Sequence, residues 1–164
     1  MRVRMGKKTA AYLLIAALCF LCFACGSDKK TSDALTGNLS EIMDTLYENA
    51  ELSEDFRAGM DSFETYEITD DLEMSILGTD EITYLEGVAS IPMISPNAYQ
   101  CVLLRVDEED VETAKQQLKE NADLNKWICV SAETMLIESR DDVIFFVMGD
   151  QDTVYALNSA FQNL

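Results

Sequence analysis

The chain has 164 residues, of which 48% are hydrophobic and 26% are charged, and its formal net charge is −18. This apolar content is too high for a disordered chain, and the length predicts one domain. The negative charge disfavours binding to nucleic acid, whose phosphates are also negative. The chain contains no histidine, which excludes Ser-His and Cys-His nucleophile pairs and histidine metal ligands.

The N-terminal segment has the layout of an export signal. Arg2, Arg4, Lys7 and Lys8 form a basic start, and residues 10–24 carry no charge. A basic region followed by a short apolar run is typical of a secretory signal. A helix that spans a bilayer needs roughly 20 apolar residues, so this run is short for a permanent span.

At the end of the apolar run, Ala24 precedes Cys25 and Gly26 follows it, while Cys22 stands where an aliphatic residue is usual. This order resembles the box at which bacterial lipoproteins are lipidated and cleaved. We predict that residues 1–24 are a signal peptide and that Cys25 carries the lipid. The protein would then be held at the extracytoplasmic face of the cell membrane by its acyl chains. An ordinary signal peptide cut near Ala24 and an uncleaved anchor are the alternatives.

The part of the chain that remains after such a cleavage is even more acidic. It holds all 30 acidic residues but only 8 of the 12 basic ones, so its formal charge is −22. Residues 25–37 are small and polar and predict a flexible tether, and residues 38–164 predict a single folded domain. Cys101 and Cys129 are the two cysteines of that domain. We interpret them as buried thiols, with a disulfide between them as the alternative.

Apolar residues at helical spacing predict three main helices. The first begins at Leu39 behind a cap at Asn38 and ends near Glu51. The second lies within residues 107–127 and the third within residues 150–164. Two less regular segments are residues 52–63, which fit a short helix or a loop, and residues 69–78, which fit one or two helical turns closed by a glycine.

The strand-like segments form two expected hairpins. Residues 82–91, with a bulge at Gly87, and residues 99–107 are joined by a turn at Ser95-Pro96-Asn97. Residues 134–139 and 143–149 form the second pair, and residues 65–68 are a short extended piece. We therefore predict an α+β fold. Its mainly antiparallel sheet has about four strands in two hairpins, with about three helices packed on one face.

This pattern resembles a family of small bacterial lipoproteins known as domain of unknown function 4358. The resemblance covers residues 39–164 and is carried by these segments: LSEIMDTLYENA, ASIPMISPNAYQCVLLRV, the helix at 111–126, TMLIES, and VIFFVMG with its following helix. It implies a lipid anchor, a tether and an α+β domain. It implies no activity and transfers no functional residue.

No motif in the sequence indicates catalysis, so we predict no catalytic residue, no cofactor and no metal site. Adjacent carboxylates are candidates for a hard cation, but we interpret them as solvated or as complements to helix N-termini. These carboxylates are Asp70-Asp71, Glu108-Glu109-Asp110, Asp141-Asp142, and Asp150 with Asp152. Cys101 lies in an expected buried strand, where its thiolate is disfavoured.

Two apolar groups are candidates for binding. Trp127 and Ile128 with Tyr99 would line a ligand pocket, and Pro92-Met93-Ile94 would form an exposed patch for a partner. Core packing is the preferred interpretation of both groups.

These observations predict a membrane-anchored binding or scaffolding domain of the cell envelope that is not an enzyme. Its expected partners are the membrane, through Cys25, and a protein of the envelope; nucleic acid is not expected. One alternative is a small solute-capturing lipoprotein of a transport system. A carboxylate-dependent envelope hydrolase is a further alternative, and it would need two buried acids that face each other in a cleft.

Overall fold

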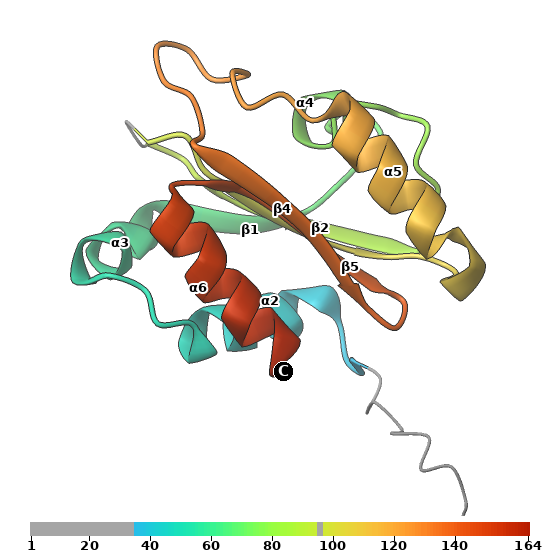
Figure 1. The fold of residues 1–164 in the computed structure, drawn as a ribbon, viewed down its shortest axis with the longest axis horizontal. Helices are drawn as coiled ribbons and strands as arrows, with labels where there is room; N and C mark the ends of the chain where they lie inside the picture. Colours follow the sequence, from blue (N-terminus) through green and yellow to red (C-terminus); the bar gives the residue numbers. More distant parts are fainter. Residues whose placement is uncertain (1–34, 95–96) are drawn as a thin grey trace, which may run out of the picture. The chain divides into compact units, whose positions relative to one another are not determined.

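A five-stranded antiparallel sheet forms the centre of the computed structural model, which describes residues 35–94 and 97–164 (Figure 1). The strand order is β1-β2-β3-β5-β4. The strands are β1 (Phe63–Glu67), β2 (Glu86–Pro92), β3 (Gln100–Arg105), β4 (Thr134–Arg140) and β5 (Val143–Gly149). The predicted signal peptide, Cys25, most of the predicted tether and Ser95-Pro96 of the predicted turn lie outside the described residues.

Both predicted hairpins are confirmed. β2 pairs with β3, with Val88 opposite Leu103, and β4 pairs with β5, with Leu136 opposite Val147. β2 begins four residues later than predicted, and its register continues through Gly87, so the predicted bulge is wrong. Residues 65–67 of the predicted short extended piece belong to β1, a fifth strand that pairs with β2.

Helices cover both faces of the sheet. The helical elements are α2 (Leu39–Asn49), α3 (Glu54–Gly59), α4 (Glu73–Ile76), α5 (Val111–Asn121) and α6 (Gln151–Gln162), with the 3₁₀ turns η1 (Met60–Ser62) and η2 (Glu108–Asp110). In Figure 1, α2, α3 and α6 lie on one side of the sheet, and α4 and α5 lie on the other. The α+β class is therefore confirmed, but the helices do not pack on one face alone as the sequence predicted.

The two central strands explain this arrangement. Successive side chains of a strand point to opposite faces, and β3 and β5 are apolar on both faces. Cys101, Leu103 and Phe145 pack in the core beneath α2 and α6. Val102 and Phe146 pack in the second core, beneath α5. A strand that is buried on both faces shows a continuous apolar run rather than alternation.

Caps and tight turns fix the helix ends. The Asn38 side chain accepts a hydrogen bond of 2.9 Å from the Glu41 amide at the start of α2, as predicted. Asp150 accepts one of 2.9 Å from the Thr153 amide at the start of α6. Gly78, which follows α4, has a φ of +81°, and a Cβ there would meet the Asn121 carbonyl oxygen at 2.3 Å.

Arg105, at the end of β3, holds the first described residues against the sheet. Its guanidinium donates to the Leu35 carbonyl at 2.8 Å and to the Gly37 carbonyl at 3.1 Å. The same group forms ion pairs with Glu86 at 3.3 Å and Asp142 at 3.2 Å. The chain therefore enters the domain at the end of the sheet where β3 ends and β2 begins.

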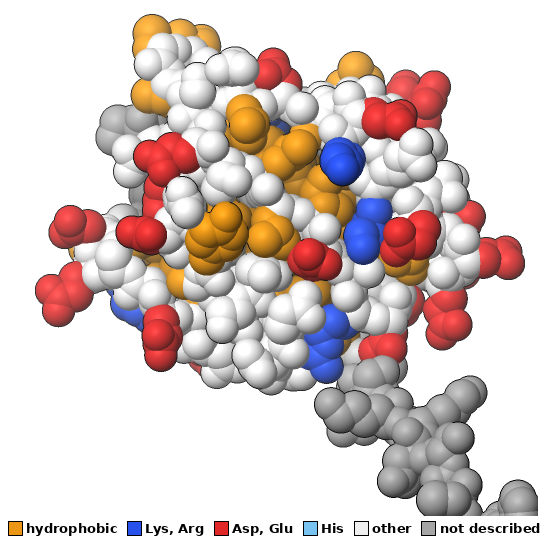
Figure 2. All heavy atoms as spheres, in the orientation of Figure 1, with side chains coloured by type: hydrophobic (Ala, Val, Ile, Leu, Met, Phe, Trp, Pro, Cys, Tyr) orange, Lys and Arg blue, Asp and Glu red, His pale blue; other side chains and the backbone are white. Residues whose placement is uncertain are grey.

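The sheet has two open edges, β1 and β4. The β1 edge carries the exposed acids Glu64 and Glu67, and β4 carries Glu138 and Arg140. Hydrophobic side chains gather over β4 between α5 and α6, with basic side chains beside them and acidic ones around the margin (Figure 2). The half-buried state of every residue of β4 agrees with this picture. Within residues 35–94 and 97–164, no helix combines the length and the apolar character needed to cross a membrane.

Candidate functional site

A cleft of about 490 Å³ opens at the end of the sheet where β3 begins and β5 ends. Its volume lies in the range of small-molecule sites, about 300–1,000 Å³. Residues from the N-terminal and the C-terminal half of the sequence line it. The lining residues are Asp55, Phe56, Gly59, Ser62, Phe63, Ile94, Asn97, Ala98, Tyr99, Val130, Ser131, Glu133 and Asp150.

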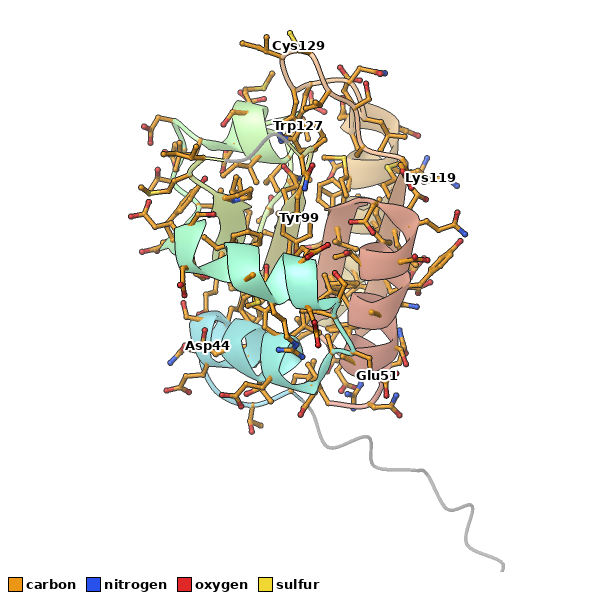
Figure 3. The ribbon with its side chains drawn as sticks, turned by 90° about the vertical axis from the view of Figure 1, so that its left-hand side faces the viewer. Asp44, Glu51, Tyr99, Lys119, Trp127 and Cys129 are labelled. Atoms are coloured by element: carbon orange, nitrogen blue, oxygen red, sulfur yellow. The ribbon has the colours of Figure 1, made fainter. Side chains whose placement is uncertain are left out.

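Three aromatic rings form the floor of this cleft. Phe56 comes from α3, Phe63 begins β1, and Tyr99 directly precedes β3. Their ring centroids are 5.1 Å apart for Phe56 and Tyr99, and 5.3 Å apart for each of the other two pairs. Phe56 and Phe63 are half-buried, so part of each ring remains open. Figure 3 places Tyr99 directly beside α3, at the centre of this view.

A buried polar pair lies behind the aromatic floor. The hydroxyls of Tyr99 and Tyr47, which comes from α2, share a hydrogen bond of 2.9 Å. Burial raises the pKa of both phenols, and it raises the pKa of the neighbouring Cys101 thiol. All three groups therefore stay neutral at physiological pH. The pair orients the Tyr99 ring rather than offering an ionised nucleophile.

The rim of the cleft is acidic. Asp55, Glu133 and Asp150 line it, and its described lining includes no lysine or arginine. One oxygen of Asp150 accepts from the Thr153 amide, and one of Glu133 accepts from the Gln151 amide at 3.2 Å. These bonds orient both carboxylates at the N-terminus of α6, and each keeps a second oxygen for a ligand. All three carboxylates are exposed.

The two loops that border the cleft expose large apolar side chains. Ile94 and Met93, after β2, are 84% and 65% exposed, and Ile128, before β4, is 91% exposed. Ile94 lines the cleft together with Val130 of the second loop. Core packing, the preferred interpretation of residues 92–94, is therefore wrong for Met93 and Ile94. These two side chains form the alternative exposed patch, and Ile94 lines the cleft.

The alternative interpretation of Trp127, Ile128 and Tyr99 as the lining of a ligand pocket holds only for Tyr99. Tyr99 lines the cleft, whereas Trp127 is half-buried and packs against the core beneath α5. Figure 3 shows Trp127 above Tyr99, nearer to the tip of the molecule at Cys129. For Trp127, core packing is the correct interpretation, and for Ile128 it is wrong.

Lys126 connects the loop before β4 to the sheet through hydrogen bonds. Its amine donates to the Ser75 carbonyl at 2.6 Å and to the Gln100 side chain, and it lies 5.3 Å from the centre of the Trp127 ring. Burial lowers its pKa to about 8, and Asp123 opposes that shift. Because two acceptors engage the amine, Lys126 has a structural role that joins α4, β3 and the loop.

The two cysteines of the domain differ in environment. Cys101 is buried and Cys129 is exposed, and both are free thiols. Cys129 has a φ of +68° at the loop tip, where no core is available to cover it. The interpretation of two buried thiols is therefore correct for Cys101 and wrong for Cys129, and the alternative disulfide is not formed.

The predicted carboxylate pairs are scattered over helix starts and turns. Asp142 pairs with Arg105, and Asp150 caps α6. The described part of the chain contains no group of three or more acidic or cysteine side chains placed to hold a metal ion. It also contains no carboxylate among its buried side chains, so two buried acids that face each other are not found there.

Sequence reasoning missed four of the aromatic and acidic residues of the cleft: Asp55, Phe56, Phe63 and Glu133. Phe56 and Phe63 lie in the segment that fitted either a helix or a loop. The one signal in the sequence was the presence of two aromatic residues in a stretch without clear periodicity. This signal does not indicate which other residues the two rings contact.

Comparisons of the chain with models of protein families, with curated proteins and with solved structures gave no match.

Proposed function

We propose that this protein is a lipid-anchored binding domain of the cell envelope that holds its aromatic cleft away from the membrane. The observation that carries the proposal is the placement of the cleft. The chain enters the domain beside Arg105 at one end of β3, and the cleft opens beside Tyr99 at the other end. The six residues of β3 separate the two ends by roughly 20 Å.

A small-molecule ligand is the second part of this proposal, because the cleft has the volume of such a site. This favours the solute-capturing role over a purely scaffolding one. The exposed loops beside the cleft would then be the surface that a transporter or another envelope protein contacts.

The anchor is tested by the intact mass of the full chain purified from membranes of its host. A mature chain that begins at an acylated Cys25 is expected, and a Cys25→Ala variant should be unprocessed or released. An unmodified chain that begins elsewhere would overturn the lipid anchor.

The extracytoplasmic position is tested with a membrane-impermeant maleimide on intact cells. One label is expected, on exposed Cys129, while buried Cys101 reacts only in denaturant. A Cys129→Ser variant should lose the label. Labelling that requires lysis of the cytoplasmic membrane would contradict the proposal.

Orientation is tested in vesicles that contain a quencher lipid. Figure 3 places Cys129 at one end of the domain and Asp44 at the other, near the point where the chain enters. A fluorophore on Asp44→Cys, in the Cys129→Ser background, should be quenched more strongly than a fluorophore on Cys129. Equal quenching would show that the cleft has no preferred direction.

A further inference from the structure

We infer that the cleft binds a small organic cation, whose apolar body lies on the aromatic floor and whose ammonium group meets the acidic rim. This inference rests on the proposed binding function and names the class of ligand. Three independent features of the same site support it: the rings, the oriented carboxylates and the field of the whole domain.

The aromatic floor suits a ligand that is both apolar and positive. The open parts of Phe56 and Phe63 offer apolar contact, and the face of an aromatic ring attracts a cation within about 6 Å of its centre. Exposed Ile94 on the rim adds apolar surface above the floor. A bare metal ion would leave this surface in water.

The rim supplies the opposite charge in a fixed orientation. Glu133 and Asp150 each use one oxygen for an amide of the α6 N-terminus. These bonds satisfy two amides of the helix N-terminus, and the remaining oxygens can accept from an ammonium group. With Asp55 also on the rim and no basic residue in the described lining, an anionic ligand would meet the repulsion of three carboxylates.

The charge of the whole domain acts in the same direction. The chain after residue 24 has a formal charge of −22, and a field of this sign raises the local concentration of cations. This field alone does not select a site. The selection comes from the cleft, where carboxylates and open aromatic rings occur together.

The experiment compares three probes of similar shape: 2-phenylethylamine, 2-phenylethanol and 3-phenylpropionate. The full-length chain in zwitterionic micelles is titrated with each probe and followed by ¹H–¹⁵N spectra. The amides of Gln151 and Thr153 are the reporters, because they donate to the two rim carboxylates. The affinity for the amine should exceed the affinity for the alcohol by about fivefold or more. The expected factor is small because exposed ion pairs and cation–π contacts each contribute modestly. The carboxylate should bind most weakly.

A charge-matched pair of variants separates the site from the overall field. Glu133→Gln with Asp150→Asn should reduce binding of the amine to that of the alcohol. Asn can still cap α6, so this variant should remain folded. The control is Glu51→Gln with Asp44→Asn, two exposed acids at the other end of the domain (Figure 3). The control variant should bind all three probes with the affinities of the wild type. Because all proteins are measured in the same micelles, partition of a probe into the detergent affects each protein equally.

The outcomes separate this inference from the proposed function. Equal binding of the three probes, with shifts at the cleft, would overturn the cation preference and leave a binding cleft in place. An equal loss of amine binding in both double variants would assign the effect to the overall field and would also overturn the inference. No binding of any probe would overturn both the ligand class and the use of the cleft for small molecules.

Discussion

The hydrogen bond between Tyr47 and Tyr99 predicts a specific pattern of non-additive stability. Both phenols are almost fully buried, at 6% and 3% exposure. Replacing one tyrosine by phenylalanine removes one hydroxyl. The hydroxyl of the other tyrosine then stays buried but loses this hydrogen bond. The cost of such an orphaned group is about 1–3 kcal/mol in the free energy of unfolding.

The two single variants should not be equal. After Tyr47→Phe, the Cys101 thiol is the hydrogen-bonding group that remains beside the Tyr99 hydroxyl, and sulfur is a weak acceptor. After Tyr99→Phe, the Tyr47 hydroxyl still has Ser90 beside it. We therefore expect a loss of about 2 kcal/mol for Tyr47→Phe and about 1 kcal/mol for Tyr99→Phe.

The double variant is the decisive one. With both hydroxyls absent, two phenylalanine rings fill the same space and no phenol remains unpaired, so its loss should not exceed that of Tyr47→Phe. Urea unfolding followed by circular dichroism measures all three, because 2 kcal/mol moves the midpoint by about 1 M. A double variant that loses the sum of the two single losses would show that the hydroxyls are not coupled in solution.

Two further predictions concern Arg105 and Cys101. Arg105→Gln should release the carbonyls of Leu35 and Gly37, so the ¹⁵N order parameter of Gly37 should fall below about 0.6; Arg57→Gln is the control and should leave it unchanged. Because burial raises the pKa of Cys101 above its ordinary value of 9.0, the unfolded chain loses that proton first and stability falls above pH 9. Compared with Cys101→Ala, the wild type should lose about 1.4 kcal/mol more per pH unit above that point, and parallel pH profiles would contradict the buried neutral thiol.

The predictable part of the fold was the part with local signals. The cap at Asn38 and the stripe that begins at Leu39 predicted α2, because helical spacing and capping act within a few residues. The two hairpins followed from apolar runs separated by turn residues. β1 was only partly predicted, because an edge strand with exposed Glu64 and Glu67 has little apolar pattern to detect.

The placement of helices on both faces was missed although its signal was present. The runs QCVLLR and VIFFVMG are apolar at successive positions, and such runs indicate burial on both faces. The cleft had no comparable signal. Phe56, Phe63 and Tyr99 meet because β1 pairs with β2 and β2 pairs with β3. These two pairings bring Phe56 and Tyr99 together although they are 43 positions apart in the sequence.

The charged edges of the sheet bear on how densely the protein can be displayed. An open edge offers unpaired backbone groups to the edge of another copy, and anchoring in two dimensions would raise the frequency of such encounters. Glu64 and Glu67 on β1 repel the acidic surface of a neighbour, whereas β4 carries one acid, Glu138, and one base, Arg140. The β1 edge is therefore better protected than the β4 edge against the joining of sheets from neighbouring copies.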